Sequence, residues 1–317
     1  MEGHPAPRRI RVTRLSPPGP VLALDVGGTN LKLALVSADG EVLARDALAY
    51  GEQPDLPAML QSLTKTARRV EKAGGARAVA LGVATPGYAR PSDGVLISGT
   101  HNVPLLAEVP LARLLEEHLH LPTILLNDGT AAALGEARHG AGRGLARFVV
   151  LTLGTGVGGG IVVEGRPVLG EGRVPPELGA MVLDDAAPPF RTLEDFCSAG
   201  GFRRAYAGRG GSAEMAVEDI FSRAAAGEDL AEAALAASCR RLAQACGTLV
   251  NALNLQACIL SGGVAASGEA LRGRVEAALT DFCWPFLLPR TAIRLASRPA
   301  DAGLIGTAVA AREGLAH

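Results

Sequence analysis

One local pattern, a short strand followed by a glycine turn and a returning strand, occurs twice in this 317-residue chain and limits how it can fold. The first copy covers residues 21–36 around Gly27-Gly28, and the second covers residues 148–163 around Gly154-Thr155-Gly156. A glycine turn between two apolar strands predicts a β-hairpin. Because strand and helix patterns alternate through the rest of the chain, we predict an α/β fold that uses this hairpin twice.

The spacing of apolar residues predicts the other elements. Spacings of three and four residues predict helices at 56–70 (ended by Gly74), 111–119 and 235–253. Continuous apolar runs predict strands at 78–84, 123–126 and 257–260. Two more helices are expected, one from about Thr130 and one after Asp301. Several of these strands end in glycine or polar residues, at the edge where open α/β sheets bind ligands.

The glycine turns carry residues suited to holding phosphate. Asp25-Val-Gly-Gly-Thr29-Asn-Leu-Lys32 combines a carboxylate, a hydroxyl, a lysine and glycines whose N–H groups can converge on an anion. Asp25 could also hold Mg²⁺ through water. The candidate cofactor-binding residues of the two turns are Asp25, Gly27, Gly28, Thr29, Lys32, Gly154, Thr155 and Gly156. A tight hairpin whose glycines supply only positive φ is the alternative, but the repetition favours phosphate binding.

Asp128 follows a predicted strand, and two interpretations of it stay open. As a catalytic carboxylate it would orient a hydroxyl and accept its proton late in phosphoryl transfer. Alternatively, Asn127 or Asp128 simply caps the helix that follows. Two later segments could approach a nucleotide: Ser261-Gly262-Gly263 after a strand, and Asp301-Ala-Gly303 before the last helix. For Asp301 a helix N-cap is the favoured interpretation.

Composition excludes several classes of protein. With 31 Lys and Arg against 32 Asp and Glu, the net charge of −1 offers no footprint for nucleic acid or an anionic membrane. Five cysteines without a CxxC pair argue against a disulfide framework and a thiolate zinc site. Residues 1–20 are expected to be a loose tail, and the apolar run after them is too short for a signal peptide. A cytoplasmic protein without membrane spans is expected.

Ordered motifs over nearly the whole chain resemble the ROK (repressor–ORF–kinase) sugar kinases of the actin/hexokinase-like, ribonuclease H-like ATPase superfamily. Besides the two glycine turns, the resemblance rests on the segments 82–87, Asn102, Asn127-Asp128 with 131–136, 177–179, 193–194 with 198–200, 261–264 and 301–306. It implies a two-domain fold with a central cleft. The small domain would contain residues 21–127 and 301–317, and the large domain residues 128–300.

The resemblance also implies the reaction. Asp128 would be the general base that activates a sugar hydroxyl against the γ-phosphate of Mg-ATP. The sugar would be glucose or a related hexose or N-acetylhexosamine, and the chain would form a homodimer. The residues implied to bind the sugar are Gly87, Asn102, Asn127, Asp128, Glu177 and Glu194. Gly262 and Gly263 would contact the nucleotide.

Two departures from the family pattern affect the expected substrate and metal content. Where the family usually has a histidine after Glu-x-Gly, this chain has Ala180. The cysteine cluster that should precede Glu194 is also absent, and Cys197 comes after it. We therefore expect a glucokinase-like protein without a zinc site, in which the loss of the histidine leaves the identity of the sugar open.

Three alternatives remain. A sugar-responsive regulator of the same family would need a DNA-binding segment before the first turn, where only 24 residues precede Asp25. A sugar- or nucleotide-binding protein without turnover is suggested by Ala180, although Asp25, Asp128 and both turns are retained. Polyphosphate could replace ATP as the donor.

Overall fold

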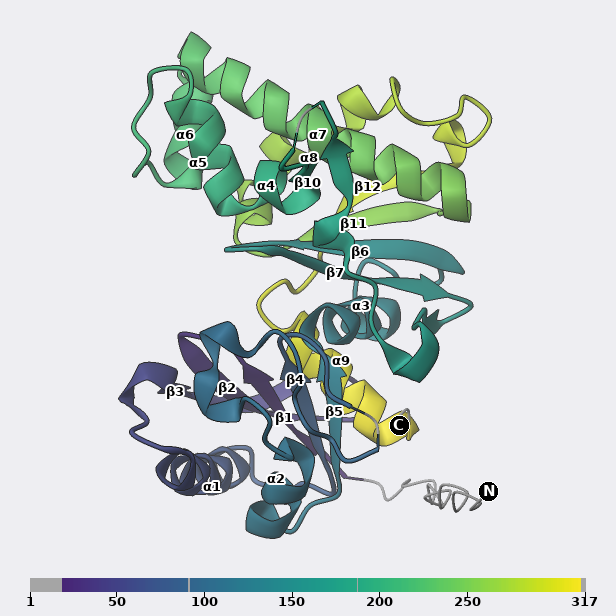
Figure 1. Ribbon diagram of the computed structural model, residues 1–317. Helices are drawn as coiled ribbons and strands as arrows, with labels where there is room; N and C mark the ends of the chain where they lie inside the picture. Colours follow the sequence, from purple (N-terminus) through teal and green to yellow (C-terminus); the bar gives the residue numbers. More distant parts are fainter. Residues whose placement is uncertain (1–18, 91, 187, 315–317) are drawn as a thin grey trace, which may run out of the picture.

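The structure, a computed structural model, describes residues 19–90, 92–186 and 188–314. Two five-stranded sheets lie one above the other, with two helices between them and the remaining helices on their outer faces (Figure 1). The predicted α/β class is confirmed. The expected N-terminal tail lies outside the described residues except for Gly19 and Pro20.

The first sheet has the strand order β3-β2-β1-β4-β5. Its strands are β1 (Val21–Val26), β2 (Asn30–Val36), β3 (Val42–Ala49), β4 (Leu81–Thr85) and β5 (Thr123–Asn127). β1 pairs antiparallel with β2, and β2 pairs antiparallel with β3, while β4 and β5 run parallel to β1. α1 (Leu56–Ala73) and α2 (Leu111–Leu119) cover the outer face of this sheet with their apolar sides.

The second sheet repeats this topology in the order β12-β11-β6-β7-β8. Its strands are β6 (Arg147–Leu153), β7 (Val157–Val163), β8 (Arg166–Pro167), β11 (Ala257–Ser261) and β12 (Ala292–Leu295). β6 pairs antiparallel with β7, and β7 pairs antiparallel with β8, while β11 and β12 run parallel to β6. The duplication seen in the two hairpins therefore extends to the two complete sheets.

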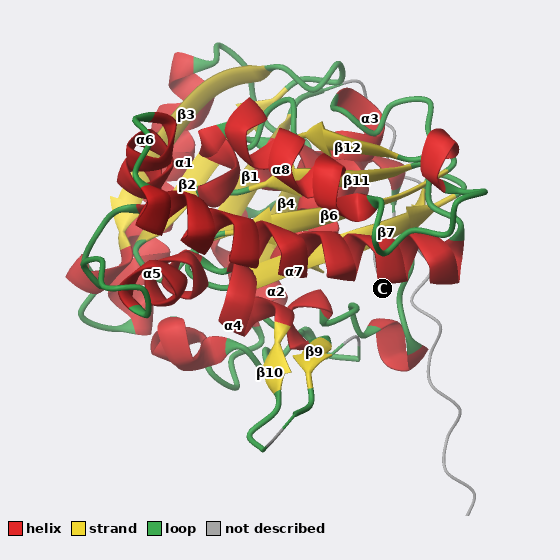
Figure 2. Ribbon diagram, turned by 90° about the horizontal axis from the view of Figure 1, so that it is seen from above, coloured by secondary structure: helices red, strands yellow, loops and turns green. Residues whose placement is uncertain are grey.

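Helices that lie between β8 and β12 in the sequence form the outer layer of the second sheet. They are α4 (Leu193–Cys197), α5 (Ala199–Ala207), α6 (Val217–Ala225), α7 (Asp229–Leu253) and α8 (Glu269–Leu279). Figure 2 shows α7 crossing the sheet, with a small hairpin of β9 (Val182–Asp184) and β10 (Arg191–Thr192) at its side. One apolar cluster joins this layer to β6, β7 and β11.

α3 (Asp128–His139) and α9 (Ala302–Glu313) lie between the sheets (Figure 1). α9 packs on the first sheet, and α3 packs on the second. Glycines allow the two helices to touch closely: a Cβ added to Gly306 would lie 1.7 Å from the carbonyl oxygen of Ala131. Short 3-10 turns complete the fold at Tyr50–Glu52, Thr100–Asn102, Pro104–Leu106, Glu171–Arg173, Leu178–Ala180, Val264–Ser267 and Leu288–Arg290.

The predicted elements are present, and several of their boundaries differ. β4 begins at Leu81 instead of Ala78, α3 begins at Asp128 instead of Thr130, and α7 begins at Asp229 instead of Leu235. All five cysteines are buried and free. Among the described residues, every helix is too short or too polar to cross a bilayer. The division into domains at residues 127 and 301 stays a prediction.

Candidate active site

The first glycine turn joins β1 to β2 and places a carboxylate beside a lysine. Asp25 and Lys32 are cross-strand partners, and Lys32 Nζ lies 3.7 Å from Asp25 Oδ2. The N–H of Gly27 donates to the carbonyl oxygen of Asn30 across the turn at 3.0 Å. Burial raises the pKa of Asp25, and the positive charge of Lys32 opposes this rise. A half-buried carboxylate thus lies at the strand end, next to the glycine turn and a lysine.

Asn127, and not Asp128, caps α3. The side-chain oxygen of Asn127 accepts a hydrogen bond from the N–H of Thr130 at 3.1 Å, and its side-chain nitrogen donates to the carbonyl oxygen of Gly87 at 3.0 Å. Asp128 is the first residue of the helix, and its Oδ1 accepts the N–H of Gly129 at 2.7 Å. Because Asn127 performs the capping, the capping role considered for Asp128 is not needed.

The surroundings of Asp128 favour the protonated form of its carboxyl group. Its pKa is raised to about 6, first by desolvation and then by the negative charges of Asp25 and Glu177. The residue nevertheless keeps an exposed surface. Protein atoms thus desolvate the carboxyl group, while part of the residue stays exposed to solvent. The structure therefore brings Asp25, Asp128 and Glu177 within electrostatic range of one another.

The second glycine turn is bound by a carboxylate from α4. Oε2 of Glu194 accepts the N–H of Val157 at 2.9 Å, and a Cβ on Gly156 would lie 2.6 Å from the same oxygen. The N–H of Ala199 donates to the carbonyl oxygen of Gly154 at 2.8 Å. The sequence indicated both Glu194 and the turn but not their contact, since 37 residues separate Glu194 from Val157.

Two sugar-side candidates lie against the first turn and α3. A Cβ on Gly28 would lie 2.9 Å from the carbonyl oxygen of Asn102, so the turn packs on the segment that carries Asn102. Gly87 has a φ of +68°, and its carbonyl oxygen accepts the hydrogen bond from the Asn127 side chain described above. Sequence patterns do not indicate Thr130, whose hydroxyl is buried at the wall of a small cavity of about 40 Å³ beside Gly87 and Asn127.

The predicted glycine motifs divide into packed and open positions. Gly158, Gly159 and Gly160 belong to β7 and not to the turn, and a Cβ on Gly129 of α3 would lie 2.3 Å from the carbonyl oxygen of Gly159. Gly262 packs its backbone against Leu153, with φ of +85°. By contrast, a Cβ on Gly263 would meet no atom within 4 Å. The open glycine leaves space for a ligand, whereas the packed glycines are explained by protein contacts.

Two further expectations concern Asp301 and zinc. Asp301 stands at the N-cap position of α9, as favoured. Its side chain makes no capping hydrogen bond, however, and pairs with Arg45 at 3.1 Å instead. Ala180 is exposed in its 3-10 turn. The described part of the chain contains no group of three His, Cys, Asp or Glu side chains placed to hold a metal. The absence of a zinc site stays a prediction.

Comparisons with known proteins agree with this arrangement. The ROK family model matches residues 21–313. A glucokinase of Thermotoga maritima is 28% identical over 314 residues, covering 92% of this chain and 97% of its own. An N-acetylmannosamine kinase of Shigella flexneri is 31% identical over 296 residues, covering 92% and 98%.

A crystal structure of a ROK hexokinase from Thermus thermophilus superposes with a TM-score of 0.77 at 28% identity, covering 93% of this chain and 99% of that one. The predicted actin/hexokinase-like fold is thereby confirmed. Since the family model covers most of the chain, this protein belongs to the ROK family.

Proposed function

We propose that the protein is an ATP-dependent sugar kinase that transfers the γ-phosphate of Mg-ATP to a hydroxyl of a hexose, with Asp128 as general base. The observation that carries the proposal is the state of the Asp128 carboxylate. It lies at the start of α3, is not needed as the helix cap and has a pKa of about 6. A base with this pKa is ionised at neutral pH and can accept a proton as the hydroxyl attacks.

The sugar-binding roles proposed for Asn127 and Glu194 leave each group a free atom. The Asn127 side-chain nitrogen has two N–H groups, of which Gly87 accepts one. Glu194 uses Oε2 for Val157, which leaves Oε1 for a sugar hydroxyl. Asn102 and Glu177 are both exposed, and Glu177 acts on the charge of Asp128. Glucose and N-acetylhexosamines are both within the proposed class, and Ala180 leaves the choice open.

The donor side of the proposal uses the two glycine turns. Thr29, Lys32 and Gly27-Gly28 on the first sheet, and Gly154-Thr155-Gly156 on the second, would bind the phosphates. Asp25 suits Mg²⁺, because its carboxylate is a hard oxygen ligand. A cation is also favoured there because the charge of Asp25 repels that of Asp128. Asp25 would hold the ion through water, and Mg²⁺ when bound neutralises charge on the phosphates.

The proposal includes a cleft between two domains. Asp25 comes from the first sheet and the second turn from the second, so both sheets would contribute to one site. We propose that residues 21–127 with 301–317 move against residues 128–300, and that closure excludes water from the transferred phosphoryl group. A homodimer stays an expectation of the family.

The function is tested by ADP release across a panel of hexoses and N-acetylhexosamines. With Mg-ATP, at least one sugar is expected to stimulate ADP release well above the rate without sugar. A parallel series with polyphosphate as donor, read as sugar phosphate formed, separates the two donors. If neither donor phosphorylates any sugar of the panel, the kinase proposal is wrong and a binding protein without turnover is favoured.

The pKa of Asp128 predicts the acid limb of the pH profile. Because the ionised form is the base and the pKa is about 6, kcat/KM for the sugar should be nearly constant above this pH and fall below it. The fall should approach about tenfold per pH unit. Nucleotide binding measured over the same range controls for protonation of Mg-ATP. A profile that stays flat well below pH 6 would contradict the assignment.

A further inference from the structure

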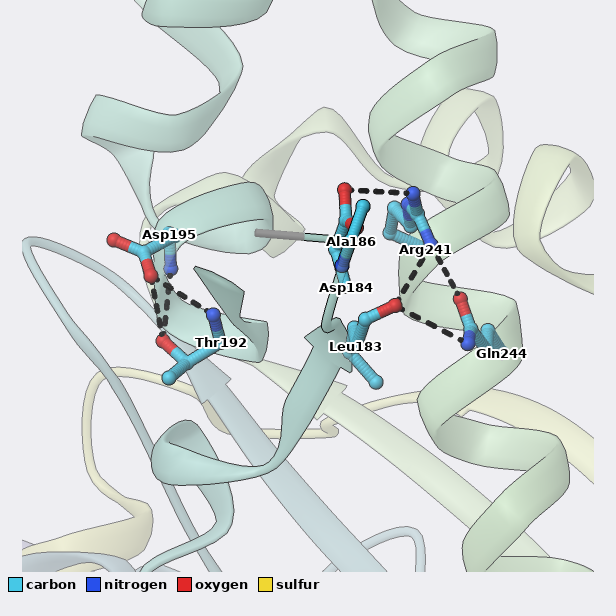
Figure 3. Close-up of polar contacts among 7 residues, drawn as sticks. All are labelled: Leu183, Asp184, Ala186, Thr192, Asp195, Arg241 and Gln244. Carbon is cyan, nitrogen blue, oxygen red and sulfur yellow. Dashed lines mark hydrogen bonds and ion pairs between the residues drawn. The ribbon is translucent and has the colours of Figure 1, made fainter. Parts of the chain in front are cut away.

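Arg241, on the long helix α7, ties down the β9–β10 hairpin. Its Nη1 donates to the carbonyl oxygen of Leu183 at 2.8 Å, and its Nη2 pairs with Asp184 Oδ2 at 3.4 Å (Figure 3). Gln244, one turn further along α7, accepts from the same guanidinium at 3.0 Å and donates to Leu183 at 3.5 Å. A planar fork that reaches a carbonyl and a carboxylate together is a geometry that lysine cannot reproduce.

The same guanidinium contacts α4. Arg241 Cζ lies 4.7 Å from the centre of the Phe196 ring, and Arg191 Cζ of β10 lies 4.0 Å from it. Such contacts between a guanidinium and an aromatic ring are attractive. Phe196 is partly buried against the core of the second sheet. Arg241 therefore contacts the hairpin and α4 at the same time.

Backbone bonds connect the hairpin rigidly to α4. β9 and β10 pair at Asp184–Arg191 and Val182–Thr192, and the N–H of Leu193 donates to the carbonyl oxygen of Met181 at 2.8 Å. Thr192 and Asp195 form a capping box at the start of α4, seen at the left of Figure 3. Because α4 has only five residues, these attachments at its beginning determine where its side chains lie.

Glu194 lies between these attachments and the second glycine turn. It follows Thr192 by two residues and precedes Phe196 by two, and its carboxylate accepts the N–H of Val157. The Cα of Gly156 is also packed toward this carboxylate. A displacement of α4 would therefore move a proposed sugar ligand and release a turn proposed to bind phosphate.

We propose that Arg241 is a positioning residue that holds Glu194 against the second glycine turn, acting through the β9–β10 hairpin and Phe196. The effect on sugar binding rests on the proposed function, whereas the effect on the position of α4 does not. Arg241 contacts the hairpin, Gln244 and Phe196, so it acts on Glu194 through its neighbours.

The kinetic test compares Arg241→Met with Arg240→Met. Arg240 is a matched control, because it lies next to Arg241 on α7, pairs with Asp281 and stacks on Phe282 at 4.8 Å, away from α4. Weakening one charge-assisted hydrogen bond to the sugar should raise the sugar KM about tenfold in Arg241→Met, with kcat within about threefold of the unaltered protein. Arg240→Met should leave both constants unchanged. Equal constants in the two variants would overturn the proposal for sugar binding.

Amide hydrogen exchange supplies a readout that does not depend on catalysis. In Arg241→Met, peptides covering residues 181–197 and 154–158 should both exchange faster than in Arg240→Met. The reason is that the acceptors of the Leu193 and Val157 N–H groups are no longer held in place. Faster exchange at 181–197 alone would show that the hairpin loosens without affecting the turn, which contradicts the proposal. If Arg241→Met does not fold, Arg241→Lys keeps the charge opposite Asp184 and is read in the same way.

The two readouts separate this inference from the proposed function. If the unaltered protein phosphorylates no sugar, the kinase proposal fails, and the exchange experiment still decides whether Arg241 holds α4. If the protein is an active kinase but exchange at residues 154–158 is the same in both variants, the positioning role is wrong while the kinase proposal stands.

Discussion

Replacing Asp128 with asparagine is expected to lower kcat by about a thousandfold, which lies within the range reported for loss of a general base. Asparagine has nearly the same shape as aspartate but cannot accept the proton of the sugar hydroxyl. Asn127 remains the cap of α3, so the helix should begin at the same residue in the variant. The N–H of Gly129 can still donate to the side-chain oxygen at position 128.

The measurement combines steady-state turnover with nucleotide binding by calorimetry. Mg-ATP should bind Asp128→Asn within about threefold of the unaltered protein, since a late proton acceptor contributes little to binding of the ground state. Asp281→Asn controls for the loss of a carboxylate, because Asp281 pairs with Arg240 on the surface of the second sheet's outer layer. Turnover of Asp128→Asn within about tenfold of the unaltered protein would remove Asp128 from the catalytic role.

The local parts of the fold could be predicted because neighbouring residues determine them. The apolar spacing of α1 and the glycine at its end identify the helix with its C-cap at Gly74. The glycine turns between apolar strands identify both hairpins. In these cases the interacting groups are close in the sequence, so periodicity and turn chemistry are sufficient.

Which glycines pack against protein and which stay open could not be predicted, because this depends on partners that are distant in the sequence. Gly158, Gly159 and Gly160 continue the second turn in sequence but form β7, where Gly159 touches Gly129 at the start of α3. Nothing near Gly159 in the sequence distinguishes a glycine that packs against a helix from one that approaches a phosphate. Only the position of α3 between the sheets separates the two.

The same limit applies to polar contacts in the site. The strand-end position of Asp128 made it a candidate, but capping and catalysis were equally consistent with the sequence. Whether Asp128 is needed as the cap depends on Asn127, whose side chain reaches both Thr130 and Gly87, the latter 40 residues away. The Arg241–Leu183 contact spans 58 residues and leaves no periodic signal, so neither pattern nor composition could indicate it.

The second large expected effect concerns stability and follows from the contact between α3 and α9. Gly306→Ala places a Cβ 1.7 Å from the carbonyl oxygen of Ala131, far inside van der Waals contact, and both residues are buried. The new atom is opposed by backbone, which cannot rotate away as a side chain can. The two helices must therefore separate, and we expect a loss of about 3 kcal/mol in the free energy of unfolding.

Gly303→Ala is the matched control for this substitution, since Gly303 lies in the same helix and a Cβ there would meet no atom within 4 Å. Alanine is the better helix former by up to about 1 kcal/mol, so Gly303→Ala should be neutral or stabilising. Thermal unfolding at one scan rate should place the midpoint of Gly306→Ala about 5 °C or more below that of the unaltered protein. Equal midpoints for Gly306→Ala and Gly303→Ala would mean that α3 and α9 can move apart at little cost, and then their contact would not be what holds Asp128 in place between the two sheets.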